Sequence, residues 1–214
     1  MKRILSVIII VVAVNLMQAQ EKGTIEFGFN TGINVSSVST SGEWADAGFG
    51  INIAGSADYY FSESWSLKAK VIYDQKGWNN GFVNAPIVDP EDYDPNVDGT
   101  LHESNVNLNY ITIPLMANYH FAKKKNWYVN FGPYVGLLIS AKETKFGVDY
   151  TEIFNRTDFG IAAGIGVKIP VSDKLKFFVE YEGNAGLNNI NKYNNFKVRS
   201  SKDALNVGIN FRFR

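Results

Sequence analysis

Apolar and polar residues alternate along much of this chain with a period of two. The C-terminal stretch NVGINFRFR places Val207, Ile209, Phe211 and Phe213 on one parity, with polar residues or glycine between them. Such alternation is typical of a β-strand with one apolar and one polar face. The pattern recurs and predicts eight strands, over residues 24–35, 48–61, 65–76, 109–121, 127–141, 159–169, 175–187 and 206–214.

The connections between these strands alternate between short and long. Short turns run from Phe61 to Trp65, from Phe121 to Trp127 and from Ile169 to Leu175, whereas the segments near 36–47, 77–105, 142–157 and 188–203 are long. Transmembrane barrels have tight periplasmic turns, long extracellular loops and an even number of strands. The predicted fold class is therefore all-β, an eight-stranded antiparallel up-and-down transmembrane β-barrel with both chain ends in the periplasm.

The N-terminus has the features of a secretory signal peptide. Lys2 and Arg3 precede an apolar run from Ile4 to Leu16, and the small residue Ala19 suits cleavage before Gln20. A helix that spans a membrane needs roughly 20 residues, which is longer than this run. We predict a cleaved signal peptide over residues 1–19, a barrel domain over residues 20–214 and a location in the outer membrane.

Side-chain volume indicates which face of the strands meets lipid. An eight-stranded barrel has an interior just wide enough for side chains to fill. The apolar parity carries many Phe, Tyr and Trp residues that would overfill this interior, whereas the polar parity is rich in glycine and small polar residues. We therefore expect the apolar set to face lipid. The alternative is a soluble periplasmic carrier of the lipocalin type, with its apolar residues turned inward.

Aromatic residues gather beside the short turns, which predicts an aromatic girdle at the periplasmic interface. Its expected members are Phe61, Trp65, Phe121, Trp127 and Phe213.

Composition narrows the functional classes. The chain has 214 residues, 45% hydrophobic content and a formal net charge of +0, so one domain is expected and nucleic acid is not an expected partner. It has no cysteine, which excludes disulfides and thiolate metal sites.

Three sequence blocks resemble the PorT-like family of outer-membrane β-barrel proteins of Gram-negative bacteria, often called porin-family proteins. The blocks are LNYITIPLMANYHF (108–121), NFGPYVGLLIS (130–140) and DFGIAAGIGVKI (158–169). The resemblance spans essentially the whole mature chain and implies an outer-membrane barrel. The family is functionally broad, and its namesake is tied to protein secretion. Many outer-membrane proteins end in an aromatic residue that the barrel-assembly machinery reads, whereas Phe213 is penultimate here.

Charged residues on the polar parity are expected to form a network inside the barrel, because charges removed from water must pair. Barrel closure brings the first and last strands together, so we predict that Glu26 pairs with Arg212. The expected result is a filled lumen, and the alternative is a narrow porin for small solutes. The lumen network is centred on Glu26, Lys68, Lys70, Glu180, Glu182 and Arg212, and the other expected inward residues are Asp58, Asp74, His120, Asp158, Lys168 and Lys176.

Two prolines interrupt predicted strands. Pro114 and Pro133 lack the N–H group that a strand donates to its neighbour, and a closed barrel has no edge to accommodate them. We predict a local bulge at each.

Other candidate chemistry is weak. Asp94, Asn96 and Asp98 match the opening of a calcium loop and would be its ligands, but residue 105 is Asn where the closing Glu is needed. The chain has two histidines, His102 and His120, and the sequence places neither of them in a recognisable catalytic arrangement with a nucleophile. We therefore expect no enzymatic activity and no cofactor.

The expected function is that of a non-enzymatic outer-membrane barrel in a structural, surface-interaction or secretion-accessory role. Its expected partners are outer-membrane lipid, the barrel-assembly machinery and an extracellular or periplasmic protein. Aromatic residues assigned to the long loops are the expected contact residues: Trp44, Trp78, Tyr93 and Tyr150.

Overall fold

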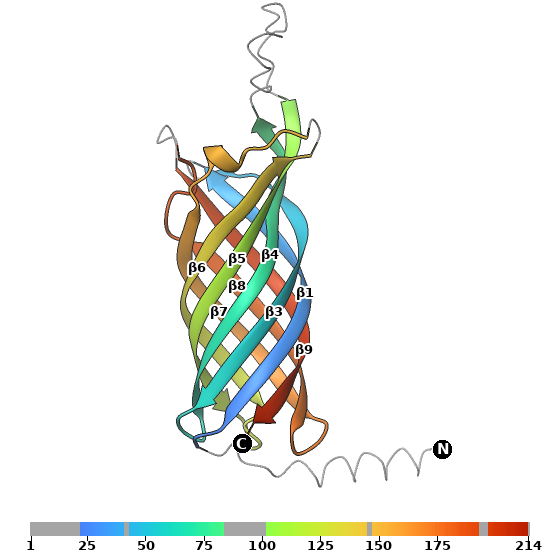
Figure 1. Ribbon diagram of the computed structural model, residues 1–214, viewed down its shortest axis with the longest axis vertical. Coiled ribbons are helices and arrows are strands. Elements are labelled where there is room, and N and C mark those ends of the chain that lie inside the picture. The colour runs from blue at the N-terminus through green and yellow to red at the C-terminus, as the bar shows by residue number, and fades with distance from the viewer. Residues whose placement is uncertain (1–21, 41–42, 84–101, 145–146, 193–196, 214) are drawn as a thin grey trace, which may run out of the picture.

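A computed structural model of the chain describes residues 22–40, 43–83, 102–144, 147–192 and 197–213 (Figure 1). Eight long strands tilt around a common axis, and the two-residue strand β2 (Glu43–Trp44) pairs with the outer end of the first of them. The long strands are β1 (Ile25–Thr40), β3 (Asp46–Tyr60), β4 (Trp65–Val83), β5 (His102–Phe121), β6 (Trp127–Glu143), β7 (Thr157–Pro170), β8 (Leu175–Gly186) and β9 (Val198–Phe213).

The long strands form one closed antiparallel sheet. Each strand pairs with the next along the chain, and β1 pairs with β9 from Ile25 opposite Phe213 to Thr40 opposite Val198. Closure satisfies the backbone groups that an open sheet would leave at its edges. The predicted eight-stranded up-and-down barrel is confirmed. No helix within the described ranges has the length and apolarity needed to cross a bilayer.

The two faces of the barrel have opposite character. Phe49 and Ile33 point outward with 84% and 66% of their surfaces exposed, whereas Lys68 and Glu180 point inward and are buried. Burial alternates in this way along each long strand up to the register shifts near the outer end, because successive side chains of a strand point to opposite faces. The lipocalin-type alternative is wrong, because it requires the apolar set to be inside.

The strands extend further at the end with the long connections than the alternation predicts. Strands β4 and β5 have 19 and 20 residues, whereas a strand needs about 9–11 to cross a bilayer. In Figure 1 these two strands project beyond their neighbours. Beyond the bilayer the outward face is polar, as at Arg199, while inward Val198 is apolar. The apolar-out pattern therefore ends there, although the strand continues.

The predicted bulges at Pro114 and Pro133 are wrong. The β5–β6 register is the same at Pro114 opposite Tyr134 as at Ala117 opposite Phe131, and the β6–β7 register is constant through Pro133. Each proline lacks the backbone N–H that would donate to the neighbouring strand. The cross-strand residue pairs on either side of the proline keep the same register.

Register shifts occur instead toward the outer end of the barrel. In the β5–β6 pair, Asn109 lies opposite Ser140 and Tyr110 lies opposite Leu138, which leaves Ile139 as an extra residue. The extra residue reverses the parity of β6, so Ala141 and Glu143 turn inward and are buried. Similar shifts occur between β3 and β4 and between β4 and β5.

Candidate functional site in the barrel lumen

The lumen contains a dense set of buried charges. Within the described residues, six lysines, four glutamates and three aspartates are buried. Charges held out of water are stable only when they pair and hydrogen-bond. The set comprises Lys68, Lys70, Lys76, Lys168, Lys176, Lys202, Glu26, Glu143, Glu180, Glu182, Asp58, Asp74 and Asp158.

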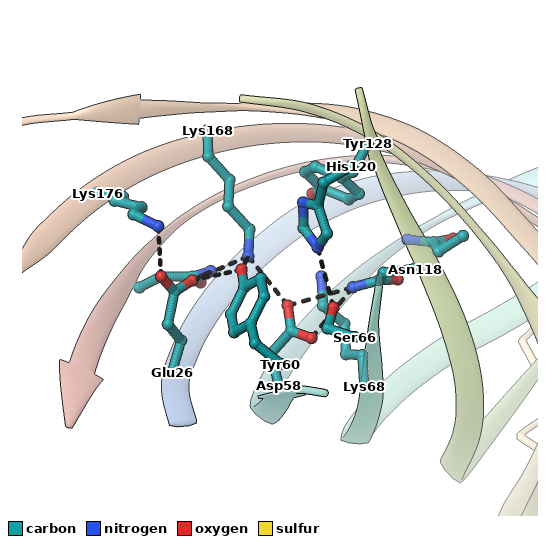
Figure 2. Close-up of polar contacts among 12 residues, drawn as sticks. Glu26, Asp58, Tyr60, Ser66, Lys68, Asn118, His120, Tyr128, Lys168 and Lys176 are labelled. Atoms are coloured by element: carbon teal, nitrogen blue, oxygen red, sulfur yellow. Dashed lines mark hydrogen bonds and ion pairs between the residues drawn. The ribbon is translucent and has the colours of Figure 1, made fainter. Parts of the chain in front are cut away.

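Lys168 on β7 is the centre of the cluster nearest the short turns (Figure 2). Its Nζ lies 2.9 Å from Glu26 Oε2, 2.9 Å from Asp58 Oδ2 and 2.6 Å from the hydroxyl of Tyr60. Lys176 on β8 also donates to Glu26. The cluster therefore links β7 and β8 to β1 and β3 across the lumen.

Arg212 has a peripheral place in this cluster. It lies opposite Glu26 in the β1–β9 ladder, and its Nε is 3.9 Å from Glu26 Oε1. The side chain of Arg212 is 11% exposed, against 1% for Glu26. The ammonium groups of Lys168 and Lys176 lie closer to Glu26, so they are its main partners.

A second cluster lies further up the lumen and is centred on Glu180. Lys70 on β4 bonds both Glu180 and Glu182 on β8, and Lys68 Nζ lies 3.5 Å from Glu180 Oε2. Tyr128 and Asn130 on β6 each donate to Glu180 Oε2 at 2.9 Å. All these groups are buried. Because its members come from β4, β6 and β8, the cluster links three strands.

Two further ion pairs lie above this cluster. Lys202 Nζ lies 2.8 Å from Asp74 Oδ2, and Lys76 Nζ lies 3.2 Å from Asp158 Oδ2. Ser200 also donates to Asp158, at 2.7 Å. Lys76 and Lys202 were missing from the predicted inward set. Lys202 lies on the part of β9 that the alternation did not identify as strand.

An apolar cluster fills the outer mouth above the charges. Phe154, which follows the 3-10 turn η2 (Thr151–Ile153), packs edge-on against Trp78 with ring centroids 5.9 Å apart. We call this group the mouth cluster, and its buried members are Val38, Trp78, Val106, Leu108, Tyr110, Leu138, Ala141, Phe154, Ile190 and Val198.

Backbone hydrogen bonds hold the β6–β7 connection over this mouth cluster. Tyr150 N donates to Ala141 O, and Asn155 N donates to Ile190 O, both at 2.8 Å. The assignment of Trp78 to a loop is wrong: it lies in β4, and only 9% of its surface is exposed, so it is not available as a surface contact residue. Tyr150 packs partly buried against the mouth cluster.

One wall of the lumen is lined by small residues. A large side chain of the neighbouring strand occupies the space left at Gly208: Phe178 on β8 lies directly opposite Gly208 in the β8–β9 ladder, and a Cβ on Gly208 would lie 2.7 Å from its ring. The lumen is thus filled asymmetrically. The small inward residues of β1, β3 and β9 include Gly28, Asn30, Gly32, Asn34, Gly50, Asn52, Ala54, Ser56, Ala204, Asn206, Gly208 and Asn210.

A closed barrel with an apolar outer band and a charged interior is the geometry of an outer-membrane protein. Residues 18–192 match the family of the outer membrane protein beta-barrel domain. The chain belongs to this family. Membership of the family implies that the protein lies in the outer membrane, and we refer to it below as the outer-membrane barrel.

Solved structures of outer-membrane proteins share the fold of this outer-membrane barrel. Neisserial surface protein A is 20% identical, with a TM-score of 0.50 over 87% of this chain and 97% of that one. OprG from Pseudomonas aeruginosa is 11% identical, with a TM-score of 0.52 over 92% and 100% of the two chains. AlkL is also 11% identical, with a TM-score of 0.52 over 92% and 93%. No curated protein is significantly similar in sequence.

The predicted girdle residues lie at the end of the outer-membrane barrel with the short turns. Phe61, Trp65, Trp127 and Phe213 are 37–69% exposed. Phe121 is half-buried and contacts Trp127, with ring centroids 6.5 Å apart.

A buried serine–histidine pair lies in the lumen of the outer-membrane barrel. Ser66 Oγ is 2.9 Å from His120 Nε2 (Figure 2). His120 Nδ1 has no hydrogen-bond partner among the described residues, so no carboxylate orients the ring as a catalytic triad requires. Both side chains are fully buried, which leaves a substrate no access.

Several predicted residues of this outer-membrane barrel cannot be placed. Asp94, Asn96, Asp98 and Tyr93 lie outside the described residues, as does the predicted signal peptide. The side chains of Trp44 and His102 are also outside the described part of the chain. Among the residues described, no group of three or more His, Cys, Asp or Glu side chains forms a metal site.

Proposed function

We propose that this protein is a PorT-like outer-membrane barrel without a continuous pore, which acts as a structural, surface-interaction or secretion-accessory protein. The observation that carries the proposal is the series of ion pairs that crosses the lumen, with the mouth cluster above it. A barrel filled in this way interacts with other molecules through its loops, turns and outer face.

The energetics of the ion pairs support a closed lumen. Breaking a buried pair by removing one partner costs about 3–5 kcal/mol, because the other charge is left buried and unpaired. Opening a passage would separate several such pairs, including Lys168 with Glu26 and Lys70 with Glu180. The apolar mouth cluster opposes the entry of water at the outer end.

A non-enzymatic role is supported by the burial of the Ser66–His120 pair. The PorT-like assignment is supported by the three sequence blocks, which form β5, β6 and β7. A secretion-accessory role is supported by the link of the family's namesake to protein secretion, and a surface-interaction role by the filled lumen, which leaves the loops, turns and outer face for contacts.

The test is single-channel conductance of the barrel in a planar bilayer. Heat-modifiable gel migration establishes first that the sample is folded. A folded barrel that gives no openings is the expected result. Steady and reproducible openings would refute the proposal and make the protein a pore.

A narrow porin for small solutes is the second candidate, and unpartnered polar atoms in the lumen favour it. Both side-chain polar atoms of Asn34 and Asn184, Oδ1 of Asn30 and Asn206, and Nδ2 of Asn52 are buried without a hydrogen-bond partner among the described residues. Amide groups of this kind are satisfied by water in most proteins. Conductance that is lost when Asn34 and Asn206 are replaced by Leu would support this candidate.

A further inference from the structure

The three short turns at the periplasmic end differ in charge. The turn between β5 and β6, residues Ala122–Asn126, carries Lys123, Lys124 and Lys125 and no acid. We call it the lysine turn. The β3–β4 turn carries Glu63 as its charged residue, and the β7–β8 turn carries one acid and one base. Among the three short turns, the excess of positive charge therefore lies in the lysine turn.

The lysine turn has a defined conformation. Ala122 and Lys125 have φ values of 66° and 51°, in the left-handed region, and Lys125 N donates to Ala122 O at 3.0 Å. Lys125 Nζ donates to Ser64 Oγ of the neighbouring turn at 2.6 Å. Lys123 and Lys124 are exposed. The turn is therefore held against its neighbour while two ammonium groups face outward.

An aromatic platform adjoins the lysine turn on the outer face of β4, β5 and β6. It consists of Trp65, Tyr119, Phe121 and Trp127, whose successive ring centroids are 4.9, 6.3 and 6.5 Å apart. Aromatic rings of outer-membrane barrels sit at the level of the lipid headgroups. The lysine turn joins the ends of β5 and β6 at Phe121 and Trp127, so it lies just beyond the platform on the periplasmic side.

We propose that the lysine turn and the aromatic platform form a binding site for anionic phospholipids in the periplasmic leaflet. The lysines bind the phosphate, and the platform packs against the glycerol backbone and upper acyl chains. Charge complementarity selects the headgroup, because a basic residue near an anionic bilayer contributes about 1 kcal/mol. The platform favours a lipid over an anionic cell-wall polymer, since its exposed rings lie on the lipid-facing surface rather than on the periplasmic end.

The test uses the fluorescence of Trp65 and Trp127, which bromine on an acyl chain quenches at contact. The purified full barrel is placed in phosphatidylcholine bilayers that contain a tenth of either brominated phosphatidylglycerol or brominated phosphatidylcholine. We expect at least fivefold preferential association with phosphatidylglycerol, the factor that corresponds to the contribution of about 1 kcal/mol from a single lysine. Replacing Lys123, Lys124 and Lys125 together with Gln should abolish this preference. Quenching of tryptophan fluorescence that disappears when Trp65 and Trp127 are replaced by Phe is assigned to the platform.

A matched control is Lys174→Gln, which removes an exposed lysine from the β7–β8 turn. It should retain the preference, and heat-modifiable migration should show that every variant is folded. Equal quenching by the two lipids in the parent, or an unchanged preference in the triple variant, would overturn the proposal. Loss of the preference on adding inorganic phosphate at constant ionic strength would assign the site to free phosphate. Lysine-dependent binding to purified peptidoglycan without a lipid preference would assign it to the cell wall.

Discussion

Lys168 meets Glu26 across the lumen, with Nζ 2.9 Å from Oε2, although the two residues are 142 positions apart in the sequence. Both side chains are 1% exposed, and Asp58 accepts from the same ammonium group. One lysine on β7 therefore holds carboxylates from the first two long strands of the barrel.

Removal of this lysine should destabilise the barrel. Lys168→Met leaves Asp58 without its closest cation and weakens the neutralisation of Glu26, so we expect a loss of about 3 kcal/mol in the free energy of unfolding. The measurement is reversible urea unfolding in lipid vesicles, followed by tryptophan fluorescence. Lys174→Met, an exposed replacement in a turn, is the control and should change stability by less than about 0.5 kcal/mol. Equal stability of the two variants would show that the cluster contributes little.

The assignment of the lipid face can be tested at Ile113. This residue lies on the outer face of β5, where it is 37% exposed. Ile113→Arg should cost about 2–4 kcal/mol if the position faces the middle of the bilayer. Ile113→Leu keeps the apolar surface and should be nearly neutral in the same vesicle unfolding assay. An unaffected arginine variant would contradict the assigned orientation.

The cap over the outer mouth depends on Phe154. Replacing a buried Phe with Ala costs about 3–5 kcal/mol in a protein core, and here we expect the loss to be local. Hydrogen exchange at the amides of Tyr150 and Asn155, which bond to Ala141 and Ile190, should accelerate by about 100-fold or more. Exchange in the strands near the short turns should be unchanged. Glu152→Ala alters an exposed residue of the same turn and should leave both rates near their parent values.

Asp149 should make the same connection sensitive to acid. Side-chain and backbone hydrogen bonds from Thr151 lower the pKa of Asp149 in the folded protein. A lowered pKa means that the contribution of the ionised carboxylate is present above the unfolded-state pKa and is lost as the pH falls through the folded-state pKa. The amide resonance of Thr151 should therefore shift on acidification, with a midpoint below the usual range of aspartate. Asp149→Ala should remove this transition, and a parent midpoint at or above the usual value would contradict the assignment.

Conductance measurements on variants can separate the two barriers in the lumen. If the ion pairs and the mouth cluster each block the passage, Phe154→Ala alone should remain silent in a planar bilayer. Combining it with Lys70→Ala, which removes the cation that bonds Glu180 and Glu182, should give measurable openings. Openings in the single variant would mean that the mouth cluster is the main barrier.

The alternation of residue types was enough to determine the strands, their two faces and the closed barrel. A strand places successive side chains on opposite faces, so a run such as Val207, Ile209, Phe211 and Phe213 separates the apolar face from the polar face locally, and the volume of the apolar side chains then indicates that this face meets lipid. Short and long connections then determined the order and direction of the strands. Each of these signals involves residues that are close in the sequence.

The tertiary structure alone decided which charges meet and where the strands end. The closeness of Lys168 to Glu26 depends on the registers of all the strands around the barrel, which no local pattern records. The position of Trp78 beside Phe154 likewise depends on a connection that folds back over the mouth. Beyond the bilayer the outward residues face water and are polar. The inward residues there, such as Val198 and Val106, pack in the mouth cluster and are apolar. The periodicity that identified each strand within the membrane is therefore reversed or lost at its outer end.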